Sequence, residues 1–165
     1  MVDYSSLSPL ERDVHFLRRS FDVARRAVTH GNHPFGALLV DRSGTVLIEV
    51  ENGYMPSHDG TAHAERLLAT MACTTLGADI LKAVTLYSSA EPCAMCAGAI
   101  YWSGIGRVVF ALSEVALATM VEEEEGVPPL HLPCREVFAR GGRAIVVDGP
   151  VDLASAAEVH QGFWT

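Results

Sequence analysis

Two short stretches of this sequence carry residue types that could bind a metal ion and move protons. Cys93 and Cys96 are three positions apart, directly after Pro92, and His63 and Glu65 precede them by about 30 positions. One imidazole and two thiolates can serve as three zinc ligands, which leaves a fourth position for a water whose pKa zinc lowers toward neutrality. A glutamate beside such a site can shuttle protons. We therefore predict a hydrolytic zinc site with Glu65 as the catalytic residue. Its metal ligands would be His63, Cys93 and Cys96.

Both halves of this site are expected where a helix begins. The apolar residues 83–87 are typical of a buried strand, and Pro92 is suited to the first turn of a following helix because it has no N–H to lose. A helix N-terminus also stabilises a thiolate. Thr61 is the expected N-cap of a second helix, whose first turn would let His63 and Glu65 flank one point beyond the helix end. The apolar stripe of that helix would contain Leu67, Leu68, Met71 and Ala72.

The order H-x-E followed by P-C-x-x-C is the signature of zinc-dependent deaminases. Over residues 34–109 the sequence resembles the cytidine/deoxycytidylate deaminase superfamily, in the branch of guanine deaminases, fungal cytosine deaminase and bacterial tRNA adenosine deaminases. The resemblance is carried by Pro34-Phe35-Gly36-Ala37, Asn52, His63-Ala64-Glu65 and the run from Glu91 to Ile100. It implies one zinc ion per chain and hydrolytic release of ammonia from a free nucleobase or nucleoside, with guanine as the first choice and cytosine as the second. It also implies a homodimer that pairs through the zinc-site helices.

The resemblance further implies a set of substrate contacts. In the resembled enzymes an asparagine at the spacing of Asn52 hydrogen-bonds the base, although Asn-Gly is also a common turn sequence. Phe35 would line the base pocket or be an ordinary core aromatic. The terminal pair Phe163 and Trp164 would close over the pocket or pack onto the sheet. The full set of expected contacts is Asn52, Phe35, Ala64, Glu91, Glu114 and Trp164.

Two acidic features have alternative interpretations. Glu91 could orient a ligand or a neighbouring backbone segment, or it could simply occupy a helix N-terminus, where acids are stabilised. The run Glu122 to Glu125 is typical of a solvated loop, although a carboxylate from this region could bind the amino edge of guanine.

Amino-acid composition and net charge limit the possible number of domains and the possible binding partners. The 165 residues are 49% hydrophobic and 19% charged, which indicates one globular domain over residues 1–165. Its catalytic core would span about 34–112 and a pocket-closing C-terminal segment about 113–165. No apolar run approaches a membrane span and no signal-peptide pattern is present, so we expect a cytoplasmic protein with reduced thiols and no membrane partner. The formal net charge of −8 makes nucleic acid an unlikely partner.

The expected fold is a three-layer α/β/α sandwich around a mixed five-stranded sheet. A capping box of Ser8 and Glu11 should open a helix over residues 9–30. Strands are expected at 36–40, 46–50, 83–87, 107–112 and 143–147. Further helices should follow residues 61 and 92 and span 113–122, 133–140 and 151–161. The buried stripe of the first helix would contain Leu10, Val14, Leu17, Phe21, Ala24 and Val28.

The first helix also carries four arginines: Arg18, Arg19, Arg25 and Arg26. They could form a nucleic-acid patch, or a solvated face paired with Asp13 and Asp22. The net charge favours the solvated face.

Two other functions stay open. A tRNA adenosine deaminase would share the catalytic motifs but needs a basic surface, whereas the tail after Asp148 contains no lysine or arginine. A purely structural zinc module would need a fourth ligand, which His131 or Cys134 could supply. That alternative gives no reason for Glu65. Otherwise Cys73 and Cys134 are expected to be small core residues.

Overall fold

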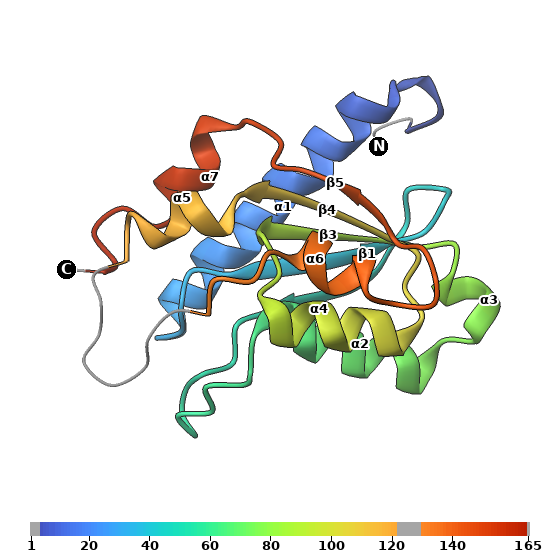
Figure 1. Cartoon of the computed structure of the whole chain (residues 1–165). Coiled ribbons are helices and arrows are strands. Elements are labelled where there is room, and N and C mark those ends of the chain that lie inside the picture. Colours follow the sequence, from blue (N-terminus) through green and yellow to red (C-terminus); the bar gives the residue numbers. More distant parts are fainter. Residues whose placement is uncertain (1–3, 122–129, 165) are drawn as a thin grey trace.

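A computed structural model describes residues 4–121 and 130–164 of the chain. Five strands form one mixed sheet in the order β2-β1-β3-β4-β5 (Figure 1). β1 runs antiparallel to both β2 and β3, whereas β3, β4 and β5 are parallel to one another. The strands are β1 (Gly36–Val40), β2 (Val46–Glu51), β3 (Thr85–Ala90), β4 (Arg107–Leu112) and β5 (Val146–Asp148).

Helices cover both faces of this sheet. α1, α5 and α7 pack on one face, and α2, α4 and α6 pack on the other, which confirms the three-layer α/β/α sandwich. The helices are α1 (Pro9–Thr29), α2 (Ala64–Thr75), α3 (Ala78–Leu81), α4 (Ala94–Ser103), α5 (Glu114–Ala118), α6 (Cys134–Ala139) and α7 (Ala154–Glu158). The short α3 and the 3-10 turn η1 (Tyr4–Ser6) were not predicted. None of the helices in the described ranges has the length and hydropathy of a membrane-spanning segment.

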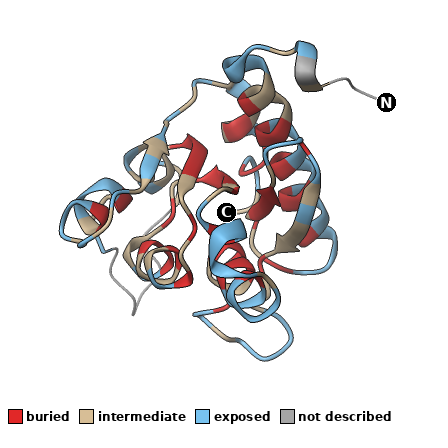
Figure 2. Cartoon of the chain, turned by 90° about the vertical axis from the view of Figure 1, so that its right-hand side faces the viewer, coloured by how far each residue is buried: buried red, intermediate tan, exposed pale blue. Residues whose placement is uncertain are grey.

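The sheet separates two apolar cores, and β1 contributes to both. All five residues of β1 are buried, because helices cover the strand on both sides. In Figure 2 the buried residues lie between the layers and the exposed residues lie on the outer faces of the helices. Leu38 and Val40 point into the core under α1, while Ala37 and Leu39 point into the core under α2 and α4. The alternation follows from the period-2 geometry of a strand. A continuous apolar run is what a strand buried on both faces requires.

The start of α1 is as predicted, but its buried face is different. Ser8 and Glu11 form the capping box. Leu10 is 62% exposed and Val28 is 38% exposed, so neither belongs to the core. Polar Asp13 and Ser20 are buried instead, because each has a hydrogen-bonding partner inside the protein. A stripe defined by hydrophobicity alone could not include them.

Most of the α1 arginines lie on a solvated, ion-paired face. Arg19 and Arg26 pair with Glu49 on β2, and Arg25 pairs with Asp22. The expectation that Asp13 pairs on this face was wrong. Asp13 is buried and turned toward the sheet, where it binds an arginine of β4.

Several element boundaries differ from the prediction. β3 begins two residues later than expected and continues to Ala90, and β5 and α7 are shorter than their predicted spans. The expected α2 stripe was partly wrong, since Met71 is 47% exposed and Leu67 is only partly buried. Cys73 is exposed rather than a core residue, whereas Cys134 is buried. The acidic run Glu122 to Glu125 lies outside the described residues.

Candidate active site

The three predicted metal ligands meet at the N-termini of α2 and α4. His63 is the N-cap of α2 and Cys93 is the N-cap of α4, both with extended backbone. The predicted helix starts were therefore slightly early. Thr61 is not the cap of α2, and Pro92 precedes the cap of α4 instead of lying in its first turn. An N-cap side chain lies beside the free N–H groups of the first turn, so both ligands project beyond the helix ends.

The spacing of the ligand atoms suits tetrahedral zinc. The Nδ1 atom of His63 is 3.5 Å from the Sγ of Cys93 and 3.6 Å from the Sγ of Cys96. Zinc bonds of about 2.3 Å to sulfur and about 2.0 Å to nitrogen at a tetrahedral angle place N and S roughly 3.5 Å apart. Within the described ranges, these three side chains form the one group whose ligand atoms can hold a metal ion. The donor set and the distances therefore fit the zinc ion that the sequence predicts.

The electrostatics of the ligands also favour a cation. A hydrogen bond from the Cys96 thiol, together with His63, lowers the pKa of Cys93 to about 4. The hydrogen bonds that His63 and Cys96 each make with Cys93 raise the pKa values of both residues. Cys93 is therefore readily ionised, and a divalent cation would favour the thiolate form of both sulfurs.

Glu65 lies in the first turn of α2 and is almost completely buried. Its side chain is 5% exposed, and its Oε1 accepts a hydrogen bond of 2.8 Å from the Oγ of Ser88. The other oxygen, Oε2, is 3.7 Å from the Sγ of Cys96. Burial raises the pKa of Glu65 above its ordinary value. A carboxyl group that is more easily protonated and held next to a metal ligand is suited to taking up and releasing protons.

Ser88, which donates to Glu65, is a further residue of the site that was not predicted from the sequence. It lies on β3 and is buried, as is its neighbour Ser89, whose Oγ accepts a hydrogen bond from the Gly36 N–H. Two adjacent serines in a buried strand just before Pro92 were the available signal. Buried hydroxyls need partners, so such a pair indicates polar contacts on both faces of the strand.

Asn52 and Phe35 lie together near the metal group. Asn52 is 1% exposed, its N–H donates to the carbonyl of Phe35, and its Oδ1 accepts from the N–H of Tyr54. The next N–H, of Gly53, donates to the carbonyl of Ala62, directly before His63. The turn role of Asn52 is thus present, and within the described part of the chain no hydrogen bond of its side-chain NH2 is found, so this group could bind a ligand. Contact with the base stays a prediction for both residues.

Ala64 is fully buried and is the first residue of α2. Because the first N–H groups of a helix have no partner within the helix, its backbone N–H is the group that could reach a substrate. This contact also stays a prediction.

Glu91 orients two neighbouring backbone segments, which is one of the roles considered for it from the sequence. Its two carboxylate oxygens accept hydrogen bonds from the N–H of Glu114 at 3.0 Å and from the N–H of Cys134 at 3.1 Å. It therefore ties the starts of α5 and α6 to the end of β3. Partial burial, together with the nearby Glu91 and Cys93, raises the pKa of Glu114, and its contact with substrate stays a prediction. The fourth-ligand role considered for Cys134 or His131 has no support, because neither joins the ligand group.

The end of the chain packs against the segment that carries Phe35. The ring of His160 lies 5.3 Å from that of Phe35, and the Trp164 ring lies 6.1 Å from it. The indole N–H of Trp164 donates to the Nδ1 of His160. His33 stacks on Tyr54 in the same region. We call this set the aromatic cluster; its members are His33, Phe35, Tyr54, His160, Phe163 and Trp164.

An α/β sandwich with a His-Cys-Cys group and a buried glutamate at the ends of its strands has the machinery of a zinc-dependent hydrolase. Residues 10–112 match the family described as "Cytidine and deoxycytidylate deaminase zinc-binding region", and the chain belongs to this family. The zinc and deaminase predictions made from the sequence are thereby confirmed at the level of the family.

Individual relatives differ in their described substrates. A probable cytosine deaminase of Schizosaccharomyces pombe is 39% identical over 160 residues, which cover 97% of each chain. A guanine deaminase of Bacillus subtilis is 43% identical over 97 residues, which cover 58% of this chain and 62% of the relative. A solved structure described as guanine deaminase from Nitrosomonas europaea superposes with a TM-score of 0.71 at 25% identity, covering 94% of this chain and 84% of that one. A tRNA-specific adenosine deaminase of Bacillus subtilis is 36% identical over 61% of this chain.

Proposed function

We propose that this protein hydrolyses the exocyclic amino group of a free nucleobase, and that cytosine is its substrate. The observation that carries the proposal is Glu65, which is buried, bonded to Ser88 and placed beside the His-Cys-Cys group without being one of its three ligands. A structural metal site has no use for such a glutamate, whereas a hydrolytic site needs a proton carrier there.

The residues of the chain divide the reaction between them. Zinc held by His63, Cys93 and Cys96 would lower the pKa of a water bound to it. Glu65 takes a proton from the attacking water and delivers it to the ring nitrogen. It then transfers the second proton to the departing amine, so that base and water become the oxo-base and ammonia. The side-chain NH2 of Asn52 is the donor that holds the ring in place.

The choice of cytosine rests on the part of the chain outside the metal motifs. Specificity within one fold is set by the loops and terminal segments around the site. The probable cytosine deaminase matches 97% of this chain, which includes α5, α7 and most of the aromatic cluster. From the sequence alone, guanine is the first choice of substrate and cytosine the second. The match over nearly the whole chain favours the opposite order. Guanine is the second candidate, because the described guanine deaminase structure also covers 94% of the chain.

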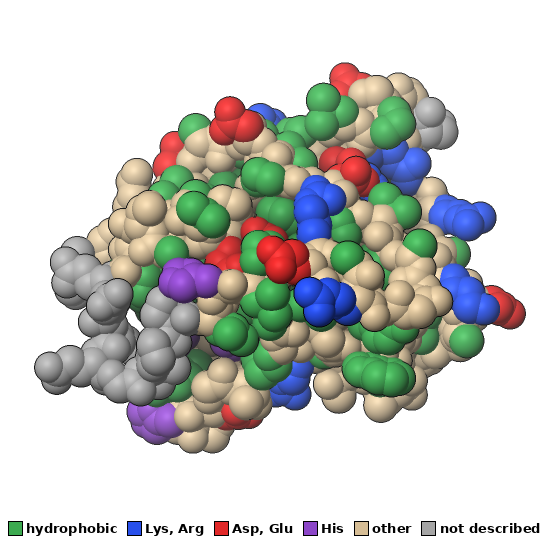
Figure 3. Space-filling model, in the orientation of Figure 1, with side chains coloured by type: hydrophobic (Ala, Val, Ile, Leu, Met, Phe, Trp, Pro, Cys, Tyr) green, Lys and Arg blue, Asp and Glu red, His purple; other side chains and the backbone are tan. Residues whose placement is uncertain are grey.

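A tRNA substrate has less support. The face shown in Figure 3 carries separated basic side chains among acidic ones, without a continuous basic area among the described residues. Arg19 and Arg26 on α1 are already paired with Glu49. Because polyanion binding depends on unpaired cations, this surface suits a small neutral base better than an RNA stem.

The test is ammonia release by the zinc-loaded protein. The panel holds cytosine, guanine, adenine, their nucleosides and a tRNA anticodon stem-loop. Glu65→Gln should lower kcat by at least about 10²–10⁴-fold, the usual contribution of a general acid–base group, while zinc content stays at one per chain. Glu136→Gln, an exposed glutamate on α6, is the matched control and should retain full activity.

Each outcome of that experiment decides one part of the proposal. Turnover of cytosine alone supports the whole of it. Turnover of guanine alone leaves the mechanism intact and replaces the substrate. Activity confined to the stem-loop would contradict the assignment of a free base. Loss of zinc in Glu65→Gln would show that the glutamate acts as a ligand or a structural residue.

We also propose that the protein is a homodimer that pairs through α4. Trp102 on α4 is 85% exposed, and Met95 on the same helix is 37% exposed. Exposed large apolar side chains near one another are typical of interfaces between subunits. Trp102→Glu should convert the dimer to a monomer in sedimentation velocity, whereas Val115→Glu, at an apolar position on α5 that is 73% exposed, should not. A monomeric unmodified protein would contradict the proposal.

A further inference from the structure

A cavity of about 350 Å³ lies where β1 ends and β3 and β4 begin, at the opposite end of β3 from the metal group. β3 begins at this cavity with Thr85 and ends beside Cys93, and β1 starts near the metal group and ends here with Val40. Its wall combines four segments: the start of α1, the turn after β1, and the starts of β3 and β4. The cavity is therefore a separate place in the fold, and nothing in the proposed deamination uses it.

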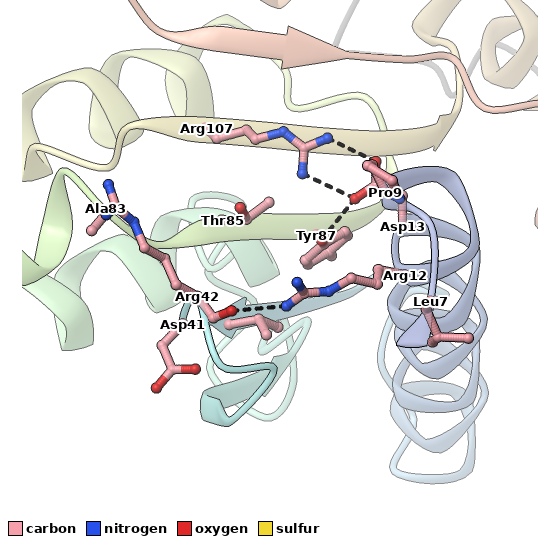
Figure 4. Close-up of a pocket in the computed structure, with 11 residues that line it drawn as sticks. Leu7, Pro9, Arg12, Asp13, Asp41, Arg42, Ala83, Thr85, Tyr87 and Arg107 are labelled. Atoms are coloured by element: carbon pink, nitrogen blue, oxygen red, sulfur yellow. Dashed lines mark hydrogen bonds and ion pairs between the residues drawn. The ribbon is translucent and has the colours of Figure 1, made fainter. Parts of the chain in front are cut away.

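Three arginines border this cavity. Figure 4 shows the side chains of Arg12, Arg42 and Arg107 arranged around it, with Thr85 between them. Arg12 donates to the backbone carbonyl oxygen of Arg42 at 2.9 Å, which holds the Arg12 guanidinium against the turn after β1. The side chain of Arg42 extends from that turn toward Ala83, on the other side of Thr85 in Figure 4. Arg12 and Arg42 come from α1 and from the turn after β1, so the tertiary fold brings them together.

The two acids in the wall do not neutralise Arg12 and Arg42. Asp13 is bonded to Arg107 and to the hydroxyl of Tyr87. Asp41 accepts hydrogen bonds from Ser43 and Thr45 within its own turn, and its carboxylate points away from the cavity in Figure 4. Within residues 4–121 and 130–164, neither Arg12 nor Arg42 forms an ion pair with a carboxylate.

The rest of the wall indicates what kind of anion would fit. Leu7, Pro9, Val40 and Ala83 supply apolar surface. Thr85 adds a hydroxyl group. A phosphate monoester carries a charge of about −1.5 to −2 at neutral pH. That charge matches two guanidinium groups that have no carboxylate partner among the described residues better than the charge of a single carboxylate does. Arginine also binds phosphate oxygens in pairs, with charge-assisted hydrogen bonds.

We propose that this cavity binds a small phosphate monoester, with its phosphate held between Arg12 and Arg42 and its organic part against the apolar wall. The partly buried pair of Asp13 and Arg107 forms an already neutralised side of the site. Because the cavity and the metal group lie at opposite ends of β3, the phosphate ligand and the substrate can be bound at the same time.

Calorimetric titration of the zinc-loaded protein tests the proposal. The probes are ribose 5-phosphate, inorganic phosphate, succinate and uncharged ribose, all at one ionic strength. Ribose 5-phosphate should bind saturably and ribose should not. Arg12→Gln and Arg42→Gln should each weaken binding of ribose 5-phosphate by about tenfold or more, the loss expected for one charge-assisted pair. Arg18→Gln, an exposed arginine on the same helix, removes the same charge and should leave the affinity unchanged.

Three results would overturn this site. One is the absence of saturable binding by both ribose 5-phosphate and inorganic phosphate. Another is equal weakening in Arg18→Gln and Arg42→Gln, which would indicate a diffuse charge effect. A third is tighter binding of succinate than of either phosphate, which would make the site a carboxylate site. None of these readings depends on deaminase activity, so they are independent of the proposed function.

Discussion

The contact between Asp13 and Arg107 joins α1 to the central strands, and its removal should destabilise the protein strongly. Asp13 accepts two hydrogen bonds from Arg107, at 2.9 and 2.7 Å, and one of 2.8 Å from the hydroxyl of Tyr87. The Asp13 side chain is 10% exposed and Tyr87 is 4% exposed. In Asp13→Ala, the tyrosine hydroxyl loses its buried partner and Arg107 keeps only Asp148.

The two losses can be estimated separately. A buried hydroxyl without a partner costs about 1–3 kcal/mol, and hydrogen bonds to a charged group contribute roughly 1.5–3 kcal/mol. Together they give about 2.5–6 kcal/mol, and we expect the lower part of this range because the Arg107 side chain is 28% exposed and keeps its ion pair with Asp148. In a domain of this size each kcal/mol lowers Tm by about 2–4 °C, so Tm should fall by about 10 °C.

Urea unfolding followed by circular dichroism, together with thermal melts, measures this effect. Asp22→Ala is the matched control, because Asp22 lies on the same helix in an exposed pair with Arg25 and should contribute at most about 1 kcal/mol. Tyr87→Phe removes one hydrogen bond and should cost about 1 kcal/mol. If Asp13→Ala and Asp22→Ala lowered the free energy of unfolding equally, the buried network would not be a source of stability.

Two further predictions concern buried positions. His160 is 2% exposed, its Nε2 has no hydrogen-bond partner among the described residues, and burial lowers its pKa to about 4. The unfolded chain then binds the extra proton below about pH 6.5, so the stabilising contribution is complete above that pH and is lost as the pH falls toward 4. Urea unfolding at pH 7 and pH 5 should show this loss, and His160→Phe should reduce it; an unchanged pH dependence in that variant would contradict the assignment. At Gly36, an added Cβ would lie 2.6 Å from the carbonyl oxygen of Ser20 and 2.7 Å from the backbone N of Ala24. Gly36→Ala should therefore push α1 from the sheet and cost at least about 1–3 kcal/mol in thermal melts, whereas Gly77→Ala, which has open space around it, should not; equal melting of the two variants would refute this steric argument.

The parts of the site that the sequence predicted are those defined by short spacing. His63 and Glu65 are two residues apart, and Cys93 and Cys96 are three apart, so each pair is placed by the first turn of one helix. Helix starts, the Ser8–Glu11 capping box and the hairpin of β1 and β2 are local as well. Errors at this level were shifts of one or two residues at the helix caps and of up to three residues at the ends of β3, β5 and α7.

The tertiary structure decided which residues far apart in the chain form hydrogen bonds and ion pairs with each other. Asp13 binds Arg107 across 94 positions and Tyr87 across 74, and no local pattern marks a buried aspartate on an amphipathic helix. The bond from Ser88 to Glu65 spans 23 positions and depends on β3 lying beneath the start of α2. Glu91 binds the backbone N–H groups of Glu114 and Cys134 at the starts of α5 and α6. The order of strands in the sheet likewise decides that these two helix starts lie beside Glu91.

The sequence by itself thus determined the group of metal-binding residues and the class of fold, because local spacing and hydrophobic periodicity are properties of neighbouring residues. It also predicts Glu65 as the proton carrier. Only the tertiary structure decided which buried polar groups satisfy one another, where the aromatic cluster lies and that a second, arginine-lined cavity exists. Burying a polar group is unfavourable unless a partner meets it, and the partner is supplied by chain topology.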